Sequence, residues 1–229
     1  MNGKYCVVIP AFDAATTIGK VVHRIKEQGL GVVVVDDGSH DRTATIAAEQ
    51  GALVISHLRT QGKGRALRTG FEHALRSRYD GVITMDGDGQ HDPVEIAQLI
   101  QAGERQHAGV VVGNRLPNGA AMPPLRRWTN QMMSGIVSVV IRQPIPDSQC
   151  GFRFIRKEVL EQVPLRAKRF EIETELLCAA ARYRWKIISV PIRSIYQDHQ
   201  TSHIRPVRDT IRFLGVILRH LIRRPSHGV

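Results

Sequence analysis

Two carboxylates, one residue apart, follow an apolar run in the first half of the chain. The run Gly81–Met85 leads directly into Asp86, Asp88 and Gln90, which glycines separate. A carboxylate at the end of a buried strand is costly unless it has a partner, and glycine lets a ligand approach the backbone closely. Such oxygen ligands suit Mg²⁺ or Mn²⁺, which also bind phosphate oxygens. We therefore predict that Asp86 and Asp88 bind a divalent metal that in turn holds a diphosphate.

Other metal-site patterns fit this segment less well. An EF-hand calcium loop needs glycine at its sixth position and glutamate at its twelfth, and counting from Asp86 these positions hold His91 and Ala97. His91, His199 and His203 match no zinc-ligand spacing, and we expect them at the surface or beside phosphate. A solvated acidic turn is the plainer alternative, because Asp-Gly pairs often mark turns.

Unusual residues also follow two earlier apolar runs. Residues 10–12 follow the run Tyr5–Ile9, and the pair Asp36 and Asp37 follows the run Gly31–Val35. In a parallel sheet the carboxyl ends of neighbouring strands share one edge, and ligands bind there. The sequence therefore predicts one site that three strand ends build together.

Apolar runs and amphipathic patterns alternate along the first half of the chain. This alternation predicts a parallel, doubly wound sheet, and the four consecutive valines Val32–Val35 indicate a strand buried on both faces. The segment Pro144–Arg156 is predicted to be irregular. The expected strands are 5–9, 31–35, 52–56, 81–85, 109–113 and 185–190. The expected helices are 17–28, 43–50, 64–77, 93–104, 126–142 and 206–224.

Several short motifs occur in a fixed order along roughly residues 4–196. They are residues 10–12, 36–41, 62–64, 86–93, 113–115, 150–153 and 170–175. The ordered set resembles family 2 glycosyltransferases, the group that includes dolichyl-phosphate mannose synthases and bacterial polyprenyl-phosphate sugar synthases. The resemblance implies the GT-A fold, an α/β fold whose Rossmann-like, mainly parallel central sheet is flanked by helices. It also implies metal-dependent transfer of a sugar from a nucleoside-diphosphate sugar, for which we expect an inverting mechanism.

The same resemblance assigns roles to individual residues. Asp88, with Gln90, would bind the metal and the diphosphate, and Asp86 would contact the ribose or the metal. Arg115 and one of Arg126 or Arg127 would meet phosphate, which a guanidinium fork binds well. The residues implied to bind the nucleotide sugar more broadly are Pro10, Ala11, Phe12, Asp37, Lys63, Asp86, Arg126 and Arg127.

The chain departs from the family pattern beside the nucleoside. The family usually has Asn-Glu after the aromatic residue, and here Asp13 and Ala14 stand in that place. Asp37 is the acid implied to accept a hydrogen bond from the base or the ribose. Because the usual glutamate is missing, the choice between uracil and guanine is left open, and so are the sugar and the acceptor.

Glu173 lies where inverting members often carry a catalytic base. A base is needed to deprotonate a sugar hydroxyl, but a phosphate acceptor is already anionic and needs none. The alternative for Glu173 is an acid stabilised by the N-terminal dipole of the following helix. Glu175 is a weaker candidate for the same role.

The formal net charge of +11 belongs to the second half of the chain. Residues 1–114 carry 12 Lys/Arg and 13 Asp/Glu, a balance of −1, whereas residues 115–229 carry 20 and 8, a balance of +12. A nucleic-acid-binding protein is not expected to divide its charge in this way, but a balanced scaffold with one cationic face is. By family resemblance that face would meet polyprenyl phosphate at a membrane surface. The arginines expected there are Arg126, Arg127, Arg193, Arg205 and Arg208.

Two helical segments suit contact with a membrane interface. Met132–Ile141 is apolar, and the predicted helix 208–224 gathers Leu214, Leu218 and Leu221 on one face while its arginines lie elsewhere. Packing of both helices on the domain, or on a second subunit of a homo-oligomer, is the alternative. We expect residues 1–200 to form the GT-A domain and residues 201–229 to be its basic helical extension.

The cysteines and the lengths of the apolar stretches indicate the cellular compartment in which we expect the protein. Cys6 and Cys178 lie in apolar runs and no Cys-x-x-Cys pair occurs, so buried, reduced thiols are expected. The first apolar run ends at Pro10 and is predicted to be a strand rather than a secretion signal. The apolar stretches are far shorter than the ~18 residues of a membrane span. We expect a cytoplasmic protein, or one peripheral on the cytoplasmic face of the membrane.

Two rival functions make different demands on the sequence. A nucleotidyltransferase would normally carry a glycine-rich, arginine-containing loop after the first strand, and residues 10–13 are Pro-Ala-Phe-Asp. A noncatalytic protein that binds anionic polymers or membranes would leave the unusual residues at the three strand ends unexplained. A glycosyltransferase with a glycan hydroxyl as acceptor stays open.

Overall fold

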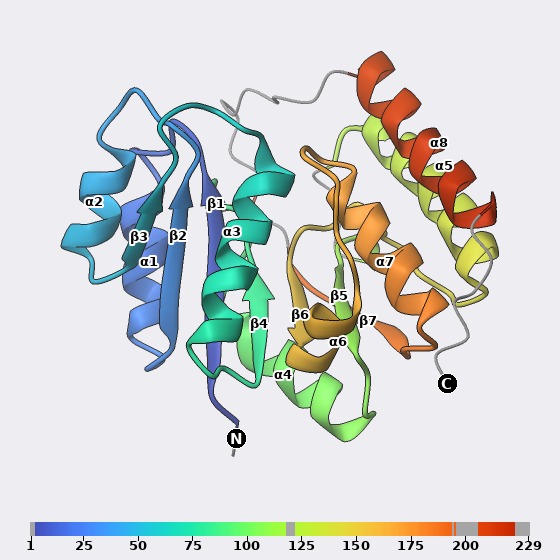
Figure 1. The fold of residues 1–229 in the computed structure, drawn as a ribbon, viewed down its shortest axis with the longest axis horizontal. Helices are drawn as coiled ribbons and strands as arrows, with labels where there is room; N and C mark the ends of the chain where they lie inside the picture. The colour runs from blue at the N-terminus through green and yellow to red at the C-terminus, as the bar shows by residue number, and fades with distance from the viewer. Residues whose placement is uncertain (1–2, 118–121, 194, 196–205, 223–229) are drawn as a thin grey trace.

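The computed structural model describes residues 3–117, 122–193, 195 and 206–222. The described strands form one sheet in the order β3-β2-β1-β4-β6-β5-β7, with helices on both faces (Figure 1). The strands are β1 (Tyr5–Ala11), β2 (Gly31–Asp36), β3 (Leu53–Ser56), β4 (Gly81–Thr84), β5 (Val110–Asn114), β6 (Arg153–Arg156) and β7 (Ile187–Pro191). The helices are α1 (Ile18–Lys26), α2 (Thr43–Glu49), α3 (Lys63–Arg76), the 3-10 helix η1 (Pro93–Glu95), α4 (Ile96–Arg105), α5 (Pro124–Ile141), α6 (Lys157–Gln162), α7 (Ile172–Arg182) and α8 (Pro206–Ile222).

The sheet is mainly parallel, as predicted. β1 pairs in parallel with β2 and β4, β2 with β3, and β5 with β7. The four valines Val32–Val35 are at most 4% exposed, which confirms that β2 is buried on both faces. This arrangement places the carboxyl ends of β1, β2 and β4 at one edge of the sheet.

Strand β6 corrects the end of the segment Pro144–Arg156, which was predicted to be irregular: residues 144–152 form no helix or strand, but the last four residues do. β6 lies antiparallel between β4 and β5, and Phe154 is paired with a residue of each. The strand has only four residues, and arginine stands at both ends, Arg153 and Arg156, so its sequence carries neither an apolar run nor a clear alternation. Each of the other strands and helices predicted by range agrees with the structure to within two residues at each end.

The cysteines are buried and unpaired. This confirms the prediction for Cys6 and Cys178, and Cys150 is buried as well. Burial raises the pKa of each of the three thiols to about 12. The thiols are therefore protonated and unreactive at neutral pH.

Helices α5 and α8 lie side by side at the outer edge of the molecule, and both pack against α7 (Figure 1). Phe213, Val216 and Ile217 of α8 are buried in the hydrophobic core. The apolar face that the sequence indicated on α8 is exposed, with Leu214 at 51% and Leu218 at 58%. None of the described helices combines the length and the apolar character needed to cross a membrane.

Candidate active site

Three strand ends meet at the carboxyl edge of the sheet. The backbone N–H of Asp37, after β2, donates to Ala11 O in β1 at 2.8 Å. The hydroxyl of Thr17, after β1, donates to Gly87 O in the segment after β4 at 2.6 Å. The structure thus brings together the three segments that the sequence grouped.

The segment after β4 forms a compact loop whose predicted metal ligands are half-buried. Asp88 Oδ1 accepts a hydrogen bond from the backbone N–H of Gln90 at 2.9 Å. Asp86 Oδ1 lies 2.7 Å from Lys63 Nζ. Burial alone would raise the pKa of Asp86, but the attraction of Lys63 lowers it below its ordinary value. Asp86 is therefore ionised and already paired with a cation.

Lys63 joins this loop to a carboxylate far away in the sequence. Its Nζ lies 2.7 Å from Asp86 Oδ1 and 2.7 Å from Glu173 Oε1. Burial alone would lower the pKa of Lys63, but the two carboxylates raise it above its ordinary value, so the amine stays charged. We refer to Lys63, Asp86 and Glu173 as the charged cluster.

Both glutamates considered as a catalytic base are already engaged. Glu173 is buried at the start of α7 and shares Lys63 with Asp86. Glu175 accepts hydrogen bonds from the backbone N–H groups of Arg166 and Ala167 at 2.8 and 2.7 Å. Glu175 therefore shapes the loop that precedes α7.

Asp37 organises the loop between β3 and α3. Its Oδ1 accepts from Gln61 N at 2.9 Å and lies 2.7 Å from His57 Nδ1, and its Oδ2 accepts from Gly62 N at 2.7 Å. Gly62 has a φ of 97°, a left-handed conformation that a side chain would strain. An ionised carboxylate has about four acceptor positions, and contacts among the described residues take three of them.

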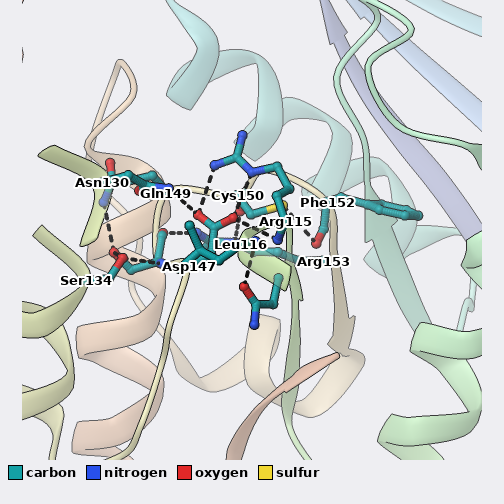
Figure 2. A network of polar contacts seen from close by, with 11 residues as sticks. Arg115, Leu116, Asn130, Ser134, Asp147, Gln149, Cys150, Phe152 and Arg153 are labelled. Atoms are coloured by element: carbon teal, nitrogen blue, oxygen red, sulfur yellow. Dashed lines mark hydrogen bonds and ion pairs between the residues drawn. The ribbon is translucent and has the colours of Figure 1, made fainter. Parts of the chain in front are cut away.

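Arg115, which was predicted to meet phosphate, forms a buried ion pair with Asp147. Arg115 Nε lies 2.7 Å from Asp147 Oδ2, Nη2 lies 2.9 Å from Oδ1, and Asn130 Nδ2 donates to Oδ1 at 2.8 Å (Figure 2). Burial alone would raise the pKa of Asp147, but its bonds with Arg115 lower it. The sequence prediction missed Asp147, although it is the only acidic residue between Arg115 and Lys157. Through Asn130, Asp147 links Arg115 at the end of β5 to helix α5.

Arg153 is a second buried cation, and its role was also missed. It is 1% exposed and donates to the backbone oxygens of Ser148 at 2.7 Å, Cys150 at 2.8 Å and Glu173 at 2.6 Å. The motif at residues 150–153 signalled its importance, but its partner on α7 is 20 residues away. Arg153 fixes the start of α7 and with it the backbone of Glu173.

His91 lies in the interior, which corrects the expectation of a surface position. It is 3% exposed and stacks on Phe152 with ring centroids 5.1 Å apart, and its Nδ1 has no hydrogen-bond partner among the described residues. Burial lowers the pKa of the imidazole to about 4; the charge of Asp86 opposes this shift. His91 is therefore neutral at pH 7. His199 and His203 lie outside the described residues.

The burial of His91 predicts a loss of stability in mild acid. Because its folded-state pKa, about 4, lies below the ordinary 6.5, its contribution is present above pH 6.5 and is lost as the pH falls toward 4. Between pH 7 and pH 5 the wild type should lose about 2 kcal/mol of unfolding free energy more than a His91→Gln variant does. Urea denaturation of the metal-free protein in EDTA measures this difference. Equal losses in the two proteins would show that His91 is not buried in neutral form.

The remaining predicted donor contacts lie around this edge. Pro10 and Phe12 are half-buried, whereas Ala11 is buried and offers mainly its backbone. Arg127 is exposed on the first turn of α5, and the side chain of Arg126 lies outside the described residues. The contacts of these residues with nucleotide stay predictions.

The ligands offered by the acidic loop fit a divalent cation that a diphosphate completes. Among the residues that the structure describes, no three His, Cys, Asp or Glu side chains gather closely enough to hold a metal alone. Mg²⁺ is usually bound through one or two carboxylates together with substrate phosphates. Asp86, Asp88 and Gln90 offer two carboxylates and an amide oxygen, which suits an open site better than a closed cage.

Comparison with known proteins identifies the family of the chain. The model of the family described as Glycosyl transferase family 2 matches residues 6–164. The chain is 31% identical over 219 residues to the UDP-N-acetylglucosamine–dolichyl-phosphate N-acetylglucosaminyltransferase of Methanococcus voltae, covering 86% of this chain and 87% of that protein. It is 30% identical over 200 residues to the polyprenol monophosphomannose synthase of Mycolicibacterium smegmatis, covering 81% of this chain and 75% of that protein.

A solved structure shares the fold. Glucosyl-3-phosphoglycerate synthase from Mycobacterium tuberculosis, in complex with Mn²⁺, uridine diphosphate and phosphoglyceric acid, superposes with a TM-score of 0.76 and 19% identity, covering 98% of this chain and 81% of that chain. At this identity the likeness shows the fold, which is GT-A. Because the family model spans most of the chain and two relatives at 30% identity or more extend the match, the chain belongs to glycosyltransferase family 2 and is a glycosyltransferase.

Proposed function

We propose that this protein transfers a sugar from a nucleoside-diphosphate sugar to polyprenyl phosphate, with inversion at the anomeric carbon and with Mg²⁺ or Mn²⁺ at the acidic loop. The observation that carries the proposal is the convergence of Asp37, Asp86 and Asp88 on one edge of the sheet. Relatives named for transfer to dolichyl phosphate and for polyprenol monophosphomannose synthesis support the acceptor. The Mn²⁺ and uridine diphosphate in the structural neighbour support the donor and the metal.

On the donor side each residue has a separate task. Asp88 and Gln90 would hold the metal, and Asp86 would contribute to the same site. When bound, the metal offsets the negative charge of the leaving diphosphate. The remaining acceptor position of Asp37 would take an N–H or hydroxyl of the nucleoside, against which residues 10–12 would pack.

The transfer itself needs orientation more than proton removal. An oxygen of the acceptor phosphate attacks the anomeric carbon from the face opposite the diphosphate, and the bond from that carbon to the diphosphate breaks. A phosphate acceptor is already anionic, so no general base is required. Arg115, oriented by Asp147, and Arg126 or Arg127 on α5 are the cations that we propose to face phosphate. Positioning and electrostatic stabilisation then supply the rate enhancement.

Helices α5 and α8 present an apolar surface that suits a membrane interface. They lie side by side, and Arg127 and Arg219 are exposed on them (Figure 1). A surface of this kind binds the headgroup region of anionic lipids. We propose that it holds the protein on the cytoplasmic face of the membrane. Its exposed apolar side chains are Leu125, Trp128, Met132 and Val139 on α5, and Leu214, Leu218, Leu221 and Ile222 on α8.

The arginines expected on this face are only partly described. Arg205 lies outside the described residues, as does the side chain of Arg208. Arg193 is exposed, and its backbone N–H donates to Glu95 at 2.9 Å. The apolar side chains of α5 and α8 therefore carry the membrane part of the proposal.

A transfer assay with a lipid acceptor tests the proposal. The protein is incubated with a panel of UDP and GDP sugars, Mn²⁺ or Mg²⁺, and polyprenyl phosphate in anionic vesicles, and the sugar in the organic phase is measured. We expect metal-dependent transfer that EDTA stops. Trp128→Glu should lower vesicle co-sedimentation and transfer by about tenfold or more, because a charge replaces an exposed aromatic side chain that would insert into the membrane interface. Gln101→Glu makes the same charge change on an exposed position of α4 and should leave both unchanged.

Different outcomes of this assay test the proposed acceptor and the proposed membrane surface separately. Nucleotide binding without transfer to polyprenyl phosphate from any donor would contradict the proposed acceptor. Transfer to a glycan hydroxyl instead would return Glu173 to the role of base. Unchanged vesicle binding by Trp128→Glu would contradict the proposed membrane surface and leave a second subunit as the partner of that face.

A further inference from the structure

We propose that Lys63 is an internal counter-cation that occupies Asp86 until the donor arrives, so that the site takes up its divalent metal together with the nucleoside diphosphate and not before. The inference rests on the proposed function, because it assigns Asp86 to the metal site. It also gives Glu173 a positioning role, as the carboxylate that holds Lys63 when Asp86 turns to the metal.

In the charged cluster, two carboxylates lie within contact distance of one ammonium group, that of Lys63. Lys63 Nζ lies 2.7 Å from Asp86 Oδ1 and 2.7 Å from Glu173 Oε1. Movement of Nζ toward Glu173 would keep one ion pair and free the oxygen of Asp86. The aromatic ring of Phe170, whose centroid is 5.6 Å from Nζ, can stabilise the cation through such a shift.

The surroundings hold the cluster in a fixed geometry. A Cβ on Gly151 would lie 2.8 Å from Asp86 Oδ2, 3.1 Å from Lys63 Nζ and 3.3 Å from Glu173 Oε1, so the three groups pack directly against backbone. Arg153 holds the backbone of Glu173 in place, because it donates to the backbone oxygen of that residue at 2.6 Å. Glu173 is therefore placed to receive the lysine and not to move with it.

The charge balance explains why metal and donor should bind together. An ammonium in contact with Asp86 repels a divalent cation at the same carboxylate, and the repulsion is weakly screened in a half-buried site. A nucleoside diphosphate brings its own negative charge to the loop. The metal is then attracted by the diphosphate and by Asp88 as well, and Lys63 can withdraw to Glu173.

The experiment measures Mn²⁺ binding in the absence of nucleotide, from the electron paramagnetic resonance signal of free Mn²⁺. The proteins are the wild type, Lys63→Met, Glu173→Gln and the double variant. The double variant decides, because it removes one positive and one negative charge and so keeps the net charge of the cluster. Arg76→Gln is the control, since it also removes a positive charge from α3 but at a side chain that is 80% exposed.

We expect the double variant to bind Mn²⁺ alone about tenfold more tightly than the wild type, a typical coupling between two sites. The increase in Mn²⁺ affinity that uridine or guanosine diphosphate produces should shrink by the same factor. Glu173→Gln alone should not bind Mn²⁺ more tightly, because Lys63 still covers Asp86. Arg76→Gln should match the wild type.

Two results would overturn different claims. If the wild type binds nucleoside diphosphate with Mn²⁺ but the double variant binds Mn²⁺ alone no more tightly than the wild type, the role of Lys63 is refuted. If the wild type binds neither uridine nor guanosine diphosphate with Mn²⁺, the donor site that we proposed as part of the function is refuted. Lys63→Met alone leaves two carboxylates facing each other, so its thermal unfolding is measured and the conclusion is drawn from the double variant.

Discussion

Replacing Asp88 with asparagine is expected to lower the rate of sugar transfer by about a hundred- to thousandfold, the usual cost of removing one electrostatic contact to a transition state. Asparagine keeps an oxygen that can accept from Gln90 N, which Asp88 does at 2.9 Å, so the loop should keep its shape. What disappears is the negative charge proposed to bind the metal. Calorimetry with Mn²⁺ should show nucleoside diphosphate binding weakened in parallel.

Asp92 provides a control on the same loop. Its Oδ1 accepts from Val94 N at 3.1 Å and pairs with Arg24 at 2.8 Å, so it caps η1 and anchors α1. Asp92→Asn should cost some stability but leave metal-dependent nucleotide binding unchanged. If Asp88→Asn binds nucleoside diphosphate with Mn²⁺ as tightly as the wild type, Asp88 is not the metal ligand.

Replacing Asp147 with asparagine should lower the free energy of unfolding by about 3–5 kcal/mol, the range for breaking a buried ion pair from one side. Asp147 is 0% exposed and accepts from Arg115 and Asn130. The variant leaves the buried guanidinium of Arg115 without its counter-charge. It also turns an acceptor-only group into one with donors that face other donors. Urea denaturation at pH 7 measures the change.

Two further variants make this result interpretable. Glu161→Gln removes a carboxylate that is 50% exposed and pairs with Lys157 on the same helix at 3.4 Å, and should cost less than about 0.5 kcal/mol. The double variant Arg115→Met and Asp147→Leu should recover much of the lost stability, because replacing both members of a buried pair with apolar groups is often neutral. A loss below about 1 kcal/mol for Asp147→Asn would mean that the pair does not hold α5 in place.

The sequence by itself predicted the parallel strands of the sheet and the edge where the candidate site lies. Alternating apolar runs and amphipathic helices are local patterns, and in a parallel sheet they place the residues that follow each strand at one edge. Asp37, Asp86 and Asp88 could therefore be grouped from their positions after β2 and β4. Their roles toward ligands stay predictions, because a sequence pattern shows where a carboxylate lies and not what it binds.

Only the tertiary structure decided which charged groups meet. Lys63 and Glu173 are 110 residues apart, and Arg115 and Asp147 are 32 apart, so no local periodicity links them. Strand β6 was missed for a related reason, since its four residues are recognisable as a strand only between β4 and β5. A buried charge takes whichever partner the packing brings within contact distance. For this reason only the structure shows that Asp86, predicted from the sequence to bind a metal, contacts Lys63 together with Glu173.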